Sequence, residues 1–215
     1  MEAKIIKRYV DKMISPMLIN AGFQKYKNNS FIREKNDLFH IVNFAIRTNS
    51  IKCSISIQPC FYPTEDVILS FGNRLNHFRN KGSGAWGNKD TTDLLINDLC
   101  EIKGLIEKNA MAWFDEVSDV PQLLKYIDKK KYKSDMLCCP SFLIELYAAY
   151  CRLYLKDYEK AKKHLKEFIN IFKDDNRPRV LQEKNMYQTY IELIERKEYD
   201  KIIHDLENSG LQINM

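Results

Sequence analysis

The first sixty residues change from a helical to a strand-like pattern of apolar positions. Apolar residues recur every three or four positions over residues 3–20, which is typical of an amphipathic helix, and Gly22 follows as a C-terminal stop. Pro16, late in this segment, is expected to end or kink the helix. Four strand-like runs, separated by short Asn-containing links, come next: residues 23–26, 31–35, 38–47 and 51–58. Links of this kind are typical of hairpin turns. The pattern therefore predicts a helix followed by an antiparallel meander.

The last hairpin of the meander allows its two faces to be assigned. If Asn49 and Ser50 form the turn, Ile46 lies opposite Cys53 and Arg47 lies opposite Lys52. One face then carries only apolar side chains, those of Val42, Phe44, Ile46, Cys53, Ile55 and Ile57. The other face carries Asn43, Arg47, Lys52, Ser54 and Ser56. A sheet with one apolar face is expected to have helices on that face only.

Helical periodicity returns after residue 90. It predicts helices over residues 92–110 and 120–131, and a linker over 132–140. Four more helices are expected after the linker, at 142–155, 158–172, 181–195 and 199–207. The helix 142–155 is apolar around much of its circumference, so we expect the 120–131 helix to cover one of its sides.

The four C-terminal helices contain a weak internal repeat. The segment from Lys156 to Lys160 matches the segment from Lys197 to Lys201 at an offset of 41, with Tyr158 and Tyr199 opening equivalent helices. Paired helices of this kind resemble tetratricopeptide (TPR) repeats, although the offset is longer than the usual spacing of about 34 residues. The predicted fold class is α+β: an antiparallel sheet meander with helices on one face in residues 1–133, then an all-α, TPR-like tail of helical hairpins in 134–215, docked on the first domain.

Composition and charge restrict the class of protein without selecting a function. Apolar residues make up 45% and charged residues 29% of the 215 positions, which excludes collagen-like, low-complexity and wholly disordered chains. The net charge of +5 comes entirely from residues 1–110, with 16 basic against 11 acidic residues, while 111–215 balance at 18 each. This surplus suits a weak anionic partner, but an ordinary soluble surface is the commoner explanation.

Neither targeting nor metal-binding signals are found. The N-terminal residues contain no uninterrupted apolar run typical of a signal peptide, and the most apolar window is short for a membrane span. We therefore expect a cytoplasmic protein with no membrane partner and with reduced thiols. The six cysteines form no CxxC pair and the four histidines no HxH or HExxH spacing, so neither a metal nor a cofactor is expected.

The segment Gly82–Gly87 formally matches GxGxxG. That motif binds a dinucleotide only between a buried parallel strand and a helix, and the preceding residues here are polar and basic. A weaker hypothesis is a phosphate site, in which loop amides act together with basic side chains, namely Arg74, His77, Arg79 and Lys81. Trp86 is expected to be either a stacking residue for a ligand or, more often for such a residue, a lid folded back over the sheet.

Four groups of segments together resemble a known family. They are Gly22–Lys25 with Phe31–Arg33, Val42–Phe44 with Ser54–Ile57, Arg74–Leu75 ahead of Trp86, and Ala112–Phe114 with 120–127. In this order they resemble the domain-of-unknown-function 4304 family of bacterial proteins over residues 5–130. Where that family often has a Gln-Lys type pair, this chain has Ala45–Ile46. The resemblance implies the fold and brings no established activity.

No catalytic constellation stands out, because the chain lacks GxSxG and any paired Cys and His at a recognisable spacing. The favoured interpretation is a bacterial, cytoplasmic, non-enzymatic protein–protein interaction module with an adaptor or immunity-like role. The alternative is a nucleotide- or nucleic-acid-binding protein that uses a basic sheet face and the Gly-rich loop. The candidate residues for a ligand or partner are Asn43, Arg47, Lys52, Arg74, His77, Arg79, Lys81 and Trp86.

Overall fold

The computed structural model describes residues 1–27, 29–64, 66–69, 71–79, 86–87, 91–134 and 139–210, with the side chains of residues 134 and 209 left aside. The fold is α+β with a helical C-terminal part, as predicted. Internal contacts divide the chain into two compact units: the first unit is residues 1–57 and 72–118, and the second unit is residues 58–71 and 119–215. Residue 133, where the sequence pattern suggested a boundary, lies inside the second unit. The docking of the helical tail stays a prediction.

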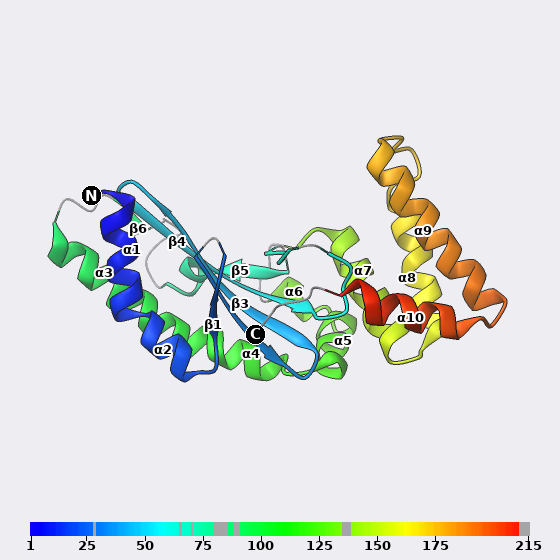
Figure 1. Ribbon diagram of the computed structural model, residues 1–215, viewed down its shortest axis with the longest axis horizontal. Helices are drawn as coiled ribbons and strands as arrows, with labels where there is room; N and C mark the ends of the chain where they lie inside the picture. Colours follow the sequence, from blue (N-terminus) through cyan, green and yellow to red (C-terminus); the bar gives the residue numbers. More distant parts are fainter. Residues whose placement is uncertain are drawn as a thin grey trace. The chain divides into compact units, whose positions relative to one another are not determined.

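The first unit opens with two helices over the segment 3–20, where the sequence predicts a helix that ends or kinks at Pro16. Helix α1 spans Ala3–Met13 and α2 spans Ser15–Asn20 (Figure 1). The break falls at Ile14 because Pro16, in the first turn of α2, has no N–H to continue the α1 hydrogen-bond ladder. Gly22 ends the segment with a φ of 84°, the left-handed conformation expected of a C-terminal stop.

The sheet is a meander of antiparallel strands in the order β1-β2-β3-β4-β5, and β6 also pairs with β4. The strands are β1 Gln24–Tyr26, β2 Ser30–Lys35, β3 Leu38–Arg47, β4 Ser50–Pro59, β5 Gly72–Arg74 and β6 Trp86–Gly87. Asn29, Asn36 and Asn49 have positive φ angles in the three hairpin turns. Because Asn tolerates this conformation better than most residues, the Asn-containing links are turns, as predicted.

The link between β3 and β4 consists of Thr48 and Asn49, because β3 ends at Arg47 and β4 begins at Ser50. Ser50 pairs with Gly87 of β6, on the other side of β4. The pairing of Arg47 with Lys52 stays a prediction.

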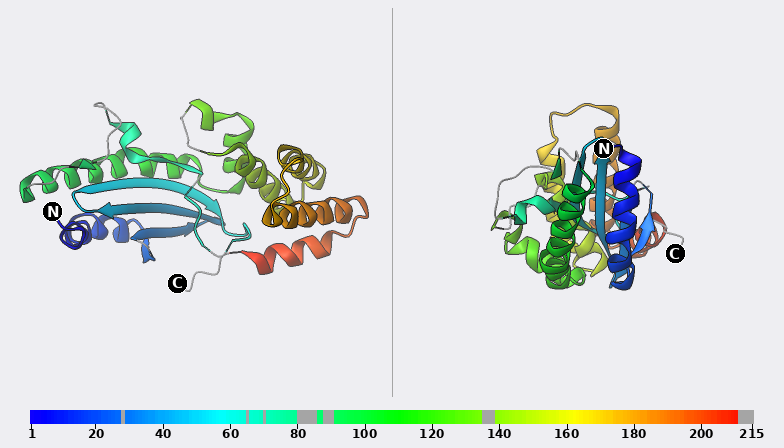
Figure 2. Two further views of the ribbon diagram at one scale, coloured as in Figure 1. Left: turned by 90° about the horizontal axis from the view of Figure 1, so that it is seen from above. Right: turned by 90° about the vertical axis from the view of Figure 1, so that its left-hand side faces the viewer.

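The apolar face of the sheet is covered by helices, as predicted. Val42, Phe44, Cys53, Ile55 and Ile57 are buried, and Ile46 is half-buried. Helix α1 contacts β3 and α3 (Thr92–Leu105), and α3 continues through a π-helical segment, Ile106–Ala110, into α4 (Met111–Glu116). On the same face, Phe114 of α4 stacks on His40 of β3 at 4.7 Å. Figures 1 and 2 show these helices along the strands.

The second unit is helical. It contains α5 Val120–Asp128, α6 Lys131–Ser134, α7 Ser141–Tyr154, α8 Tyr158–Ile171, α9 Pro178–Glu195 and α10 Tyr199–Ser209. Helix α6 therefore occupies part of the segment expected to be a linker. None of the helices in the described part of the chain has the length and hydropathy needed to cross a membrane.

Helix α7 is the centre of the second unit. Every residue from Leu146 to Leu153 is buried. Helix α5 packs against α7, which confirms the predicted cover on one side. A further cover comes from the segment 58–71, where the rings of Tyr62 and Phe71 contact the ring of Tyr147 at centroid distances of 5.0 and 5.2 Å. A helix that is apolar nearly all round is thus enclosed by parts of the chain that are distant in sequence.

Candidate functional site

The predicted basic residues on the outer face of the sheet lie on three neighbouring strands, β3, β4 and β5. Arg47 and Lys52 are exposed, and Arg74 is an exposed residue that pairs with Ser54 in the β4–β5 register. Arg74 and Lys52 therefore share a face and lie one cross-strand pair apart. Asn43 is half-buried, and its side-chain amide donates a hydrogen bond of 2.9 Å to the Ser30 hydroxyl.

The predicted Gly-rich phosphate loop is described only in part. His77 is exposed on a short 3-10 helix, Leu75–Phe78. Lys81 and the residues from Gly82 to Ala85 lie outside the described residues. Trp86 and Gly87 form β6, which pairs with the start of β4.

Trp86 is buried in the first unit, where it belongs to strand β6 of the sheet. Its side chain is 2% exposed, and the indole N–H donates a 2.7 Å hydrogen bond to Oε2 of Glu101 on α3. Arg79 donates from Nε to the other oxygen of Glu101 at 2.9 Å. The Arg79 guanidinium carbon also lies 5.0 Å from the centroid of the Trp86 ring. Glu101, Trp86 and Arg79 therefore form a closed cluster in which the arginine already has a carboxylate and an aromatic partner.

This cluster disfavours the predicted anion site at Arg79. An incoming phosphate would have to displace Glu101 or lie beside its negative charge. Sequence reasoning missed Glu101 because nothing in its helical spacing distinguishes it from the solvated carboxylates around it. Glu101 is 22 residues from Arg79, so no local sequence pattern indicates that the two side chains meet.

A concave apolar surface is found in the second unit. It is a groove of about 380 Å³ between the end of α7, α10 and the segment 58–71. Its lining residues are Phe61, Leu153, Tyr154, Lys156, Ile203, Leu206 and Glu207. The ring of Phe61 stacks on Tyr154 at 4.3 Å, with an interplanar angle of 5°. Leu153 and Leu206 are buried at the base of the groove, whereas Tyr154 is 39% exposed at its edge. We call this surface the α7–α10 groove.

A polar network holds the end of α7 against α5 and α8. Arg152 is only 7% exposed, and its Nη2 donates two 2.7 Å bonds to the Asp128 carboxylate. Its Nη1 donates to Asp157 at 3.1 Å and its Nε to His164 Nε2 at 3.2 Å. His164 in turn contacts Glu145 through Nδ1 at 2.7 Å. The network joins α5, α7 and α8, so the buried guanidinium is fully paired.

The charge on Asp157 is stabilised within this network. Partial burial by itself would raise the pKa of Asp157, but the hydrogen bond and charge of Lys160, together with Arg152, hold that pKa below its ordinary value. The residues of the network are therefore explained by ion pairing and by the connection between helices.

Among the described residues, no group of three or more His, Cys, Asp or Glu side chains is placed to hold a metal ion. Burial raises the pKa of the Cys53 and Cys151 thiols well above its ordinary value, so neither is an activated nucleophile.

Comparisons with known proteins were made with the whole chain. No family model, no curated protein and no solved structure matches it. The function is therefore argued from the groove, the networks and the surface of the chain itself.

Proposed function

We propose that the chain is a non-enzymatic protein–protein interaction module, with an adaptor or immunity-like role in the bacterial cytoplasm. In this proposal the α7–α10 groove holds an amphipathic helix of a partner protein. Membership of the domain-of-unknown-function 4304 family remains a prediction that concerns residues 5–130 alone.

The observation that carries the proposal is the repetition of one turn in the second unit. Lys156 and Lys197 have φ angles of 62° and 61° at positions 41 residues apart. The Asp157 amide, which follows Lys156, donates to the Arg152 carbonyl at 2.8 Å. The Glu198 amide, which follows Lys197, donates to the Leu193 carbonyl at 2.9 Å. The α7–α8 and α9–α10 hairpins thus close with the same backbone geometry.

Equivalent residues of the two hairpins are also in contact. Tyr158 and Tyr199 open α8 and α10, and their rings stack at 3.9 Å with an interplanar angle of 5°. Direct contact between equivalent positions of neighbouring hairpins is typical of stacked helical repeats, whose concave surfaces bind protein segments. This supports a TPR-like interpretation of residues 141–209.

The lining of the groove indicates what kind of segment fits. Its base is apolar. An amphipathic partner helix would place its apolar residues, at positions i, i+3 and i+4, against this base. Lys156 and Glu207 add charges of opposite sign at the surface of the groove. We therefore expect a partner helix with an acidic residue near Lys156 and a basic residue near Glu207.

The alternative function, nucleic-acid binding, rests on a different observation. Arg47, Lys52 and Arg74 are exposed and form no ion pair with the residues that the structure describes. Stacking aromatics are also required for such a surface, and Trp86, the aromatic residue among the candidate site residues, is buried. Retention on immobilised DNA that falls with salt and with Arg47→Gln would favour this alternative.

The proposed function is tested by photo-crosslinking in cells that naturally produce the protein. A photoreactive phenylalanine analogue replaces Tyr154 at the groove in one variant and Leu181 on α9 in the control variant. Both native side chains are 39% exposed, so accessibility is matched. We expect a discrete adduct with one protein from position 154, reduced when Leu206→Asp is added, and none from position 181.

The crosslinked segment is then synthesised as a peptide. It should bind the intact purified chain and gain helical circular dichroism on binding. Equal adducts from both positions, no adduct from position 154, or a crosslinked peptide that does not bind would each contradict the proposal.

A further inference from the structure

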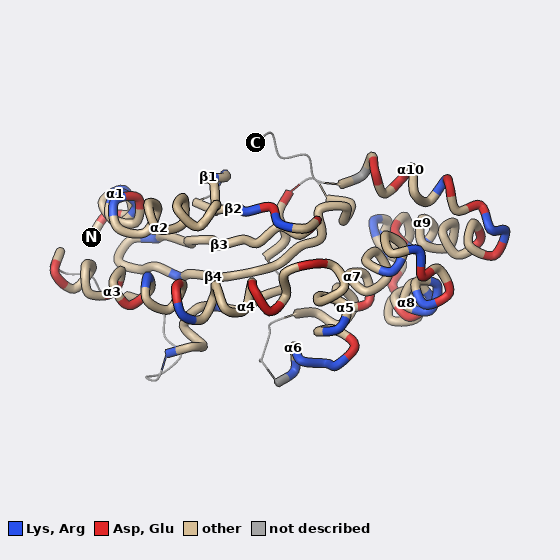
Figure 3. Tube along the Cα trace, turned by 90° about the horizontal axis from the view of Figure 1, so that it is seen from below, with Lys and Arg blue, Asp and Glu red and all other residues tan. Residues whose placement is uncertain are grey.

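The second unit contains a dense run of lysines where α5 ends and α6 begins. Between positions 125 and 133 the sequence has five lysines and one carboxylate, that of Asp128. All five lysines are exposed: Lys125, Lys129, Lys130, Lys131 and Lys133. Figure 3 shows the run as a blue stretch at α6. We call this surface the α5–α6 corner. It was not among the predicted site residues because basic and acidic residues balance over 111–215 as a whole.

The backbone gathers the five lysines onto one short bend. The Lys129 amide, at the end of α5, donates to the Lys125 carbonyl at 3.1 Å. Lys130 then adopts the left-handed conformation, with a φ of 54°, and turns the chain into α6. The Lys133 amide donates to the Lys130 carbonyl at 3.0 Å. The positive charges are therefore concentrated at one corner of the second unit.

The carboxylates near the α5–α6 corner already have partners. Asp128 accepts two 2.7 Å bonds from Nη2 of Arg152. Burial, and next the charge of Glu145, raise the pKa of Tyr132, which places Glu145 near the run. Glu145 in turn contacts Nδ1 of His164 at 2.7 Å. Within the part of the chain that the structure describes, no ion pair is formed by Lys125, Lys129, Lys130 or Lys133.

Helix capping explains only a part of this charge. Cations at the C-terminal end of a helix are favourable because the last carbonyl groups carry partial negative charge, which accounts for Lys129 and Lys130. Lys125 and Lys129, however, lie four positions apart, where like charges on a helix repel each other. Lys131 and Lys133 add to the same local potential. Five cations around carboxylates that are already bound favour a polyanionic partner.

An aromatic ring within the run indicates which polyanion fits. Tyr132 lies between Lys131 and Lys133 and is partly exposed. Tyr126 is buried, and Lys131 Nζ lies 6.0 Å from its ring centroid, so Tyr132 is the ring of the run that a ligand can reach. Unpaired bases stack on such rings, whereas an acidic peptide carries no base to stack. The combination favours a single-stranded nucleic acid over an acidic protein segment.

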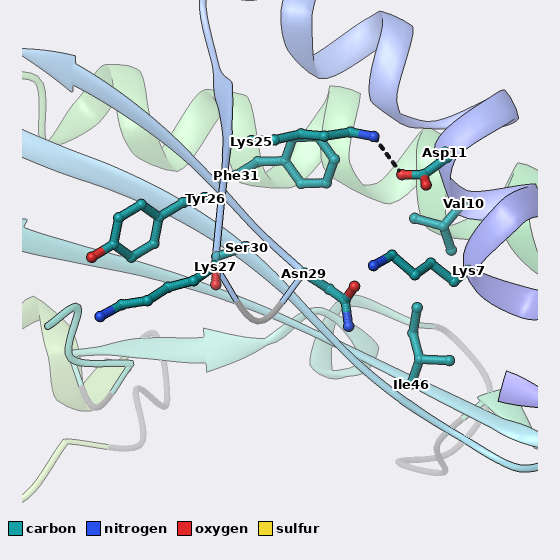
Figure 4. A pocket seen from close by; sticks show the side chains of 10 residues that line it. All are labelled: Lys7, Val10, Asp11, Lys25, Tyr26, Lys27, Asn29, Ser30, Phe31 and Ile46. Atoms are coloured by element: carbon teal, nitrogen blue, oxygen red, sulfur yellow. Dashed lines mark hydrogen bonds and ion pairs between the residues drawn. The ribbon is translucent and has the colours of Figure 1, made fainter. Parts of the chain in front are cut away.

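The basic pocket of the first unit lacks this combination. It measures about 290 Å³ and lies between α1 and the β1–β2 hairpin, with Lys7 and Lys25 in its lining (Figure 4). Lys25 is already paired with Asp11 at 2.8 Å. Ser30 pairs with Asn43 and lies on the sheet face opposite to the one that α1 covers, so the polar groups of this pocket do not converge.

We propose that the α5–α6 corner binds a single-stranded nucleic acid, with its lysines as partners of the phosphates and Tyr132 as a stacking ring. Lysine ammonium groups bind phosphates as point charges, so this contact has no sequence preference. The corner shares no residue with the lining of the α7–α10 groove, so its failure and that of the proposed function are separate results. It is also distinct from the basic sheet face that the alternative function would use.

The test measures binding of the intact chain to a fluorescent oligothymidylate of about 12 nucleotides by anisotropy, over a series of salt concentrations. We expect saturable binding whose affinity falls with salt, since each phosphate that is neutralised contributes about 0.7 to the slope of log affinity against log salt. The combined variant Lys125→Gln, Lys129→Gln and Lys133→Gln should weaken binding about tenfold or more and reduce this slope by about 2.

A matched variant distinguishes the corner from general charge attraction. Lys4→Gln, Lys7→Gln and Lys12→Gln together remove the same charge from exposed positions of α1 and should leave the affinity within about threefold. Equal losses in the two triple variants would overturn the proposal. So would an affinity that falls only when the sheet face is changed, by Arg47→Gln, Lys52→Gln and Arg74→Gln together.

A last variant tests the choice of a single strand. Tyr132→Leu keeps the charge and should weaken binding of the oligothymidylate several-fold, with no effect on a DNA duplex of the same length. Unchanged binding of the oligothymidylate by Tyr132→Leu would contradict the proposal. An oligoglutamate of equal charge that binds as tightly as the oligothymidylate would overturn it in favour of an acidic protein partner.

Discussion

Each unit contains an arginine whose side chain contacts a histidine ring. In the first unit, Arg33 donates from Nη1 to the Ala21 carbonyl at 3.0 Å, and its Nη2 contacts His40 Nδ1, also at 3.0 Å. In the second unit, Arg152 Nε contacts His164 Nε2. A ring nitrogen that accepts from an arginine must be unprotonated, so the Arg33 contact requires a neutral His40 imidazole. His40 is also fully buried and stacked on Phe114.

Acid is therefore expected to destabilise the first unit through His40. Burial, and next the charge of Arg33, lower the pKa of His40 to about 4, against 6.5 in the unfolded chain. Because the folded pKa is lowered, the contribution of the neutral imidazole is complete above pH 6.5. It is lost as the pH falls from 6.5 towards 4, by up to about 3 kcal/mol.

The measurement is urea unfolding followed by tryptophan fluorescence, since Trp86 and Trp113 both belong to the first unit. His40→Phe should flatten the dependence of the unfolding free energy on pH over this interval. His77→Gln, at an exposed position of the same unit, should leave it unchanged. An unaltered pH dependence in His40→Phe would show that other groups cause it.

At the scale of elements, the repeated turns of the second unit place a lysine in a conformation that suits glycine. Lys156 and Lys197 both adopt the left-handed region immediately after a helix. A side chain costs about 1 kcal/mol there, and glycine at this position is the usual helix stop. The two turns share their geometry, so they should respond alike to the same substitution.

Lys156→Gly and Lys197→Gly are each expected to stabilise the second unit by about 0.5–1 kcal/mol. Thermal unfolding followed by far-ultraviolet circular dichroism measures the effect. The control is Lys129→Gly. Lys129 follows the end of α5 with a φ of −76°, so glycine relieves no backbone strain there and should not raise the stability. A gain at one turn and a loss at the other would show that the two hairpins are not equivalent.

The sequence pattern predicted most of these elements because their signals are local. The spacing of apolar residues located the helices, and asparagine residues located the turns. The matching segments at Lys156 and Lys197 located the repeat. The β3–β4 turn was expected at Asn49 and Ser50, whereas the strand bounds leave Thr48 and Asn49 between the strands. Asn49, with its positive φ, is compatible with either turn position.

The candidate sites were harder to predict because they join distant segments. Glu101 neutralises Arg79 from a helix 22 residues away, and neither residue has a pattern that identifies the other. Phe61 belongs to a segment between two strands, yet it lines a groove formed by helices of the second unit.

At the scale of the molecule, the two units interleave along the chain. The segment 58–71 leaves the sheet after β4 and belongs to the second unit, and the chain returns to the sheet at Gly72. A Cβ at Gly72 would lie 1.9 Å from the Ile55 carbonyl oxygen, so only glycine permits β5 to approach β4 at this point. The segment supplies Tyr62 and Phe71 to the cover of α7, and Phe61 to the groove.

The central claim is that segment 58–71 is a structural part of the second unit and thereby completes the partner groove. Hydrogen exchange of the intact chain carrying Arg152→Met tests it most directly. The substitution leaves Asp128 and Asp157 without their buried cation, and should lower the stability of the second unit by about 2 kcal/mol. The experiment compares the hydrogen-exchange rates of backbone amides in segment 58–71 with those of amides in α7 and in the sheet.

The Tyr62 amide donates to the Pro59 carbonyl, and the Ile68 amide donates to the Gln58 side chain. We predict that both exchange faster in the variant, in parallel with the amides of α7, while the Phe44 amide in the sheet keeps its rate. Unchanged protection of Tyr62 and Ile68 alongside faster exchange in α7 would contradict the claim and remove one wall of the groove.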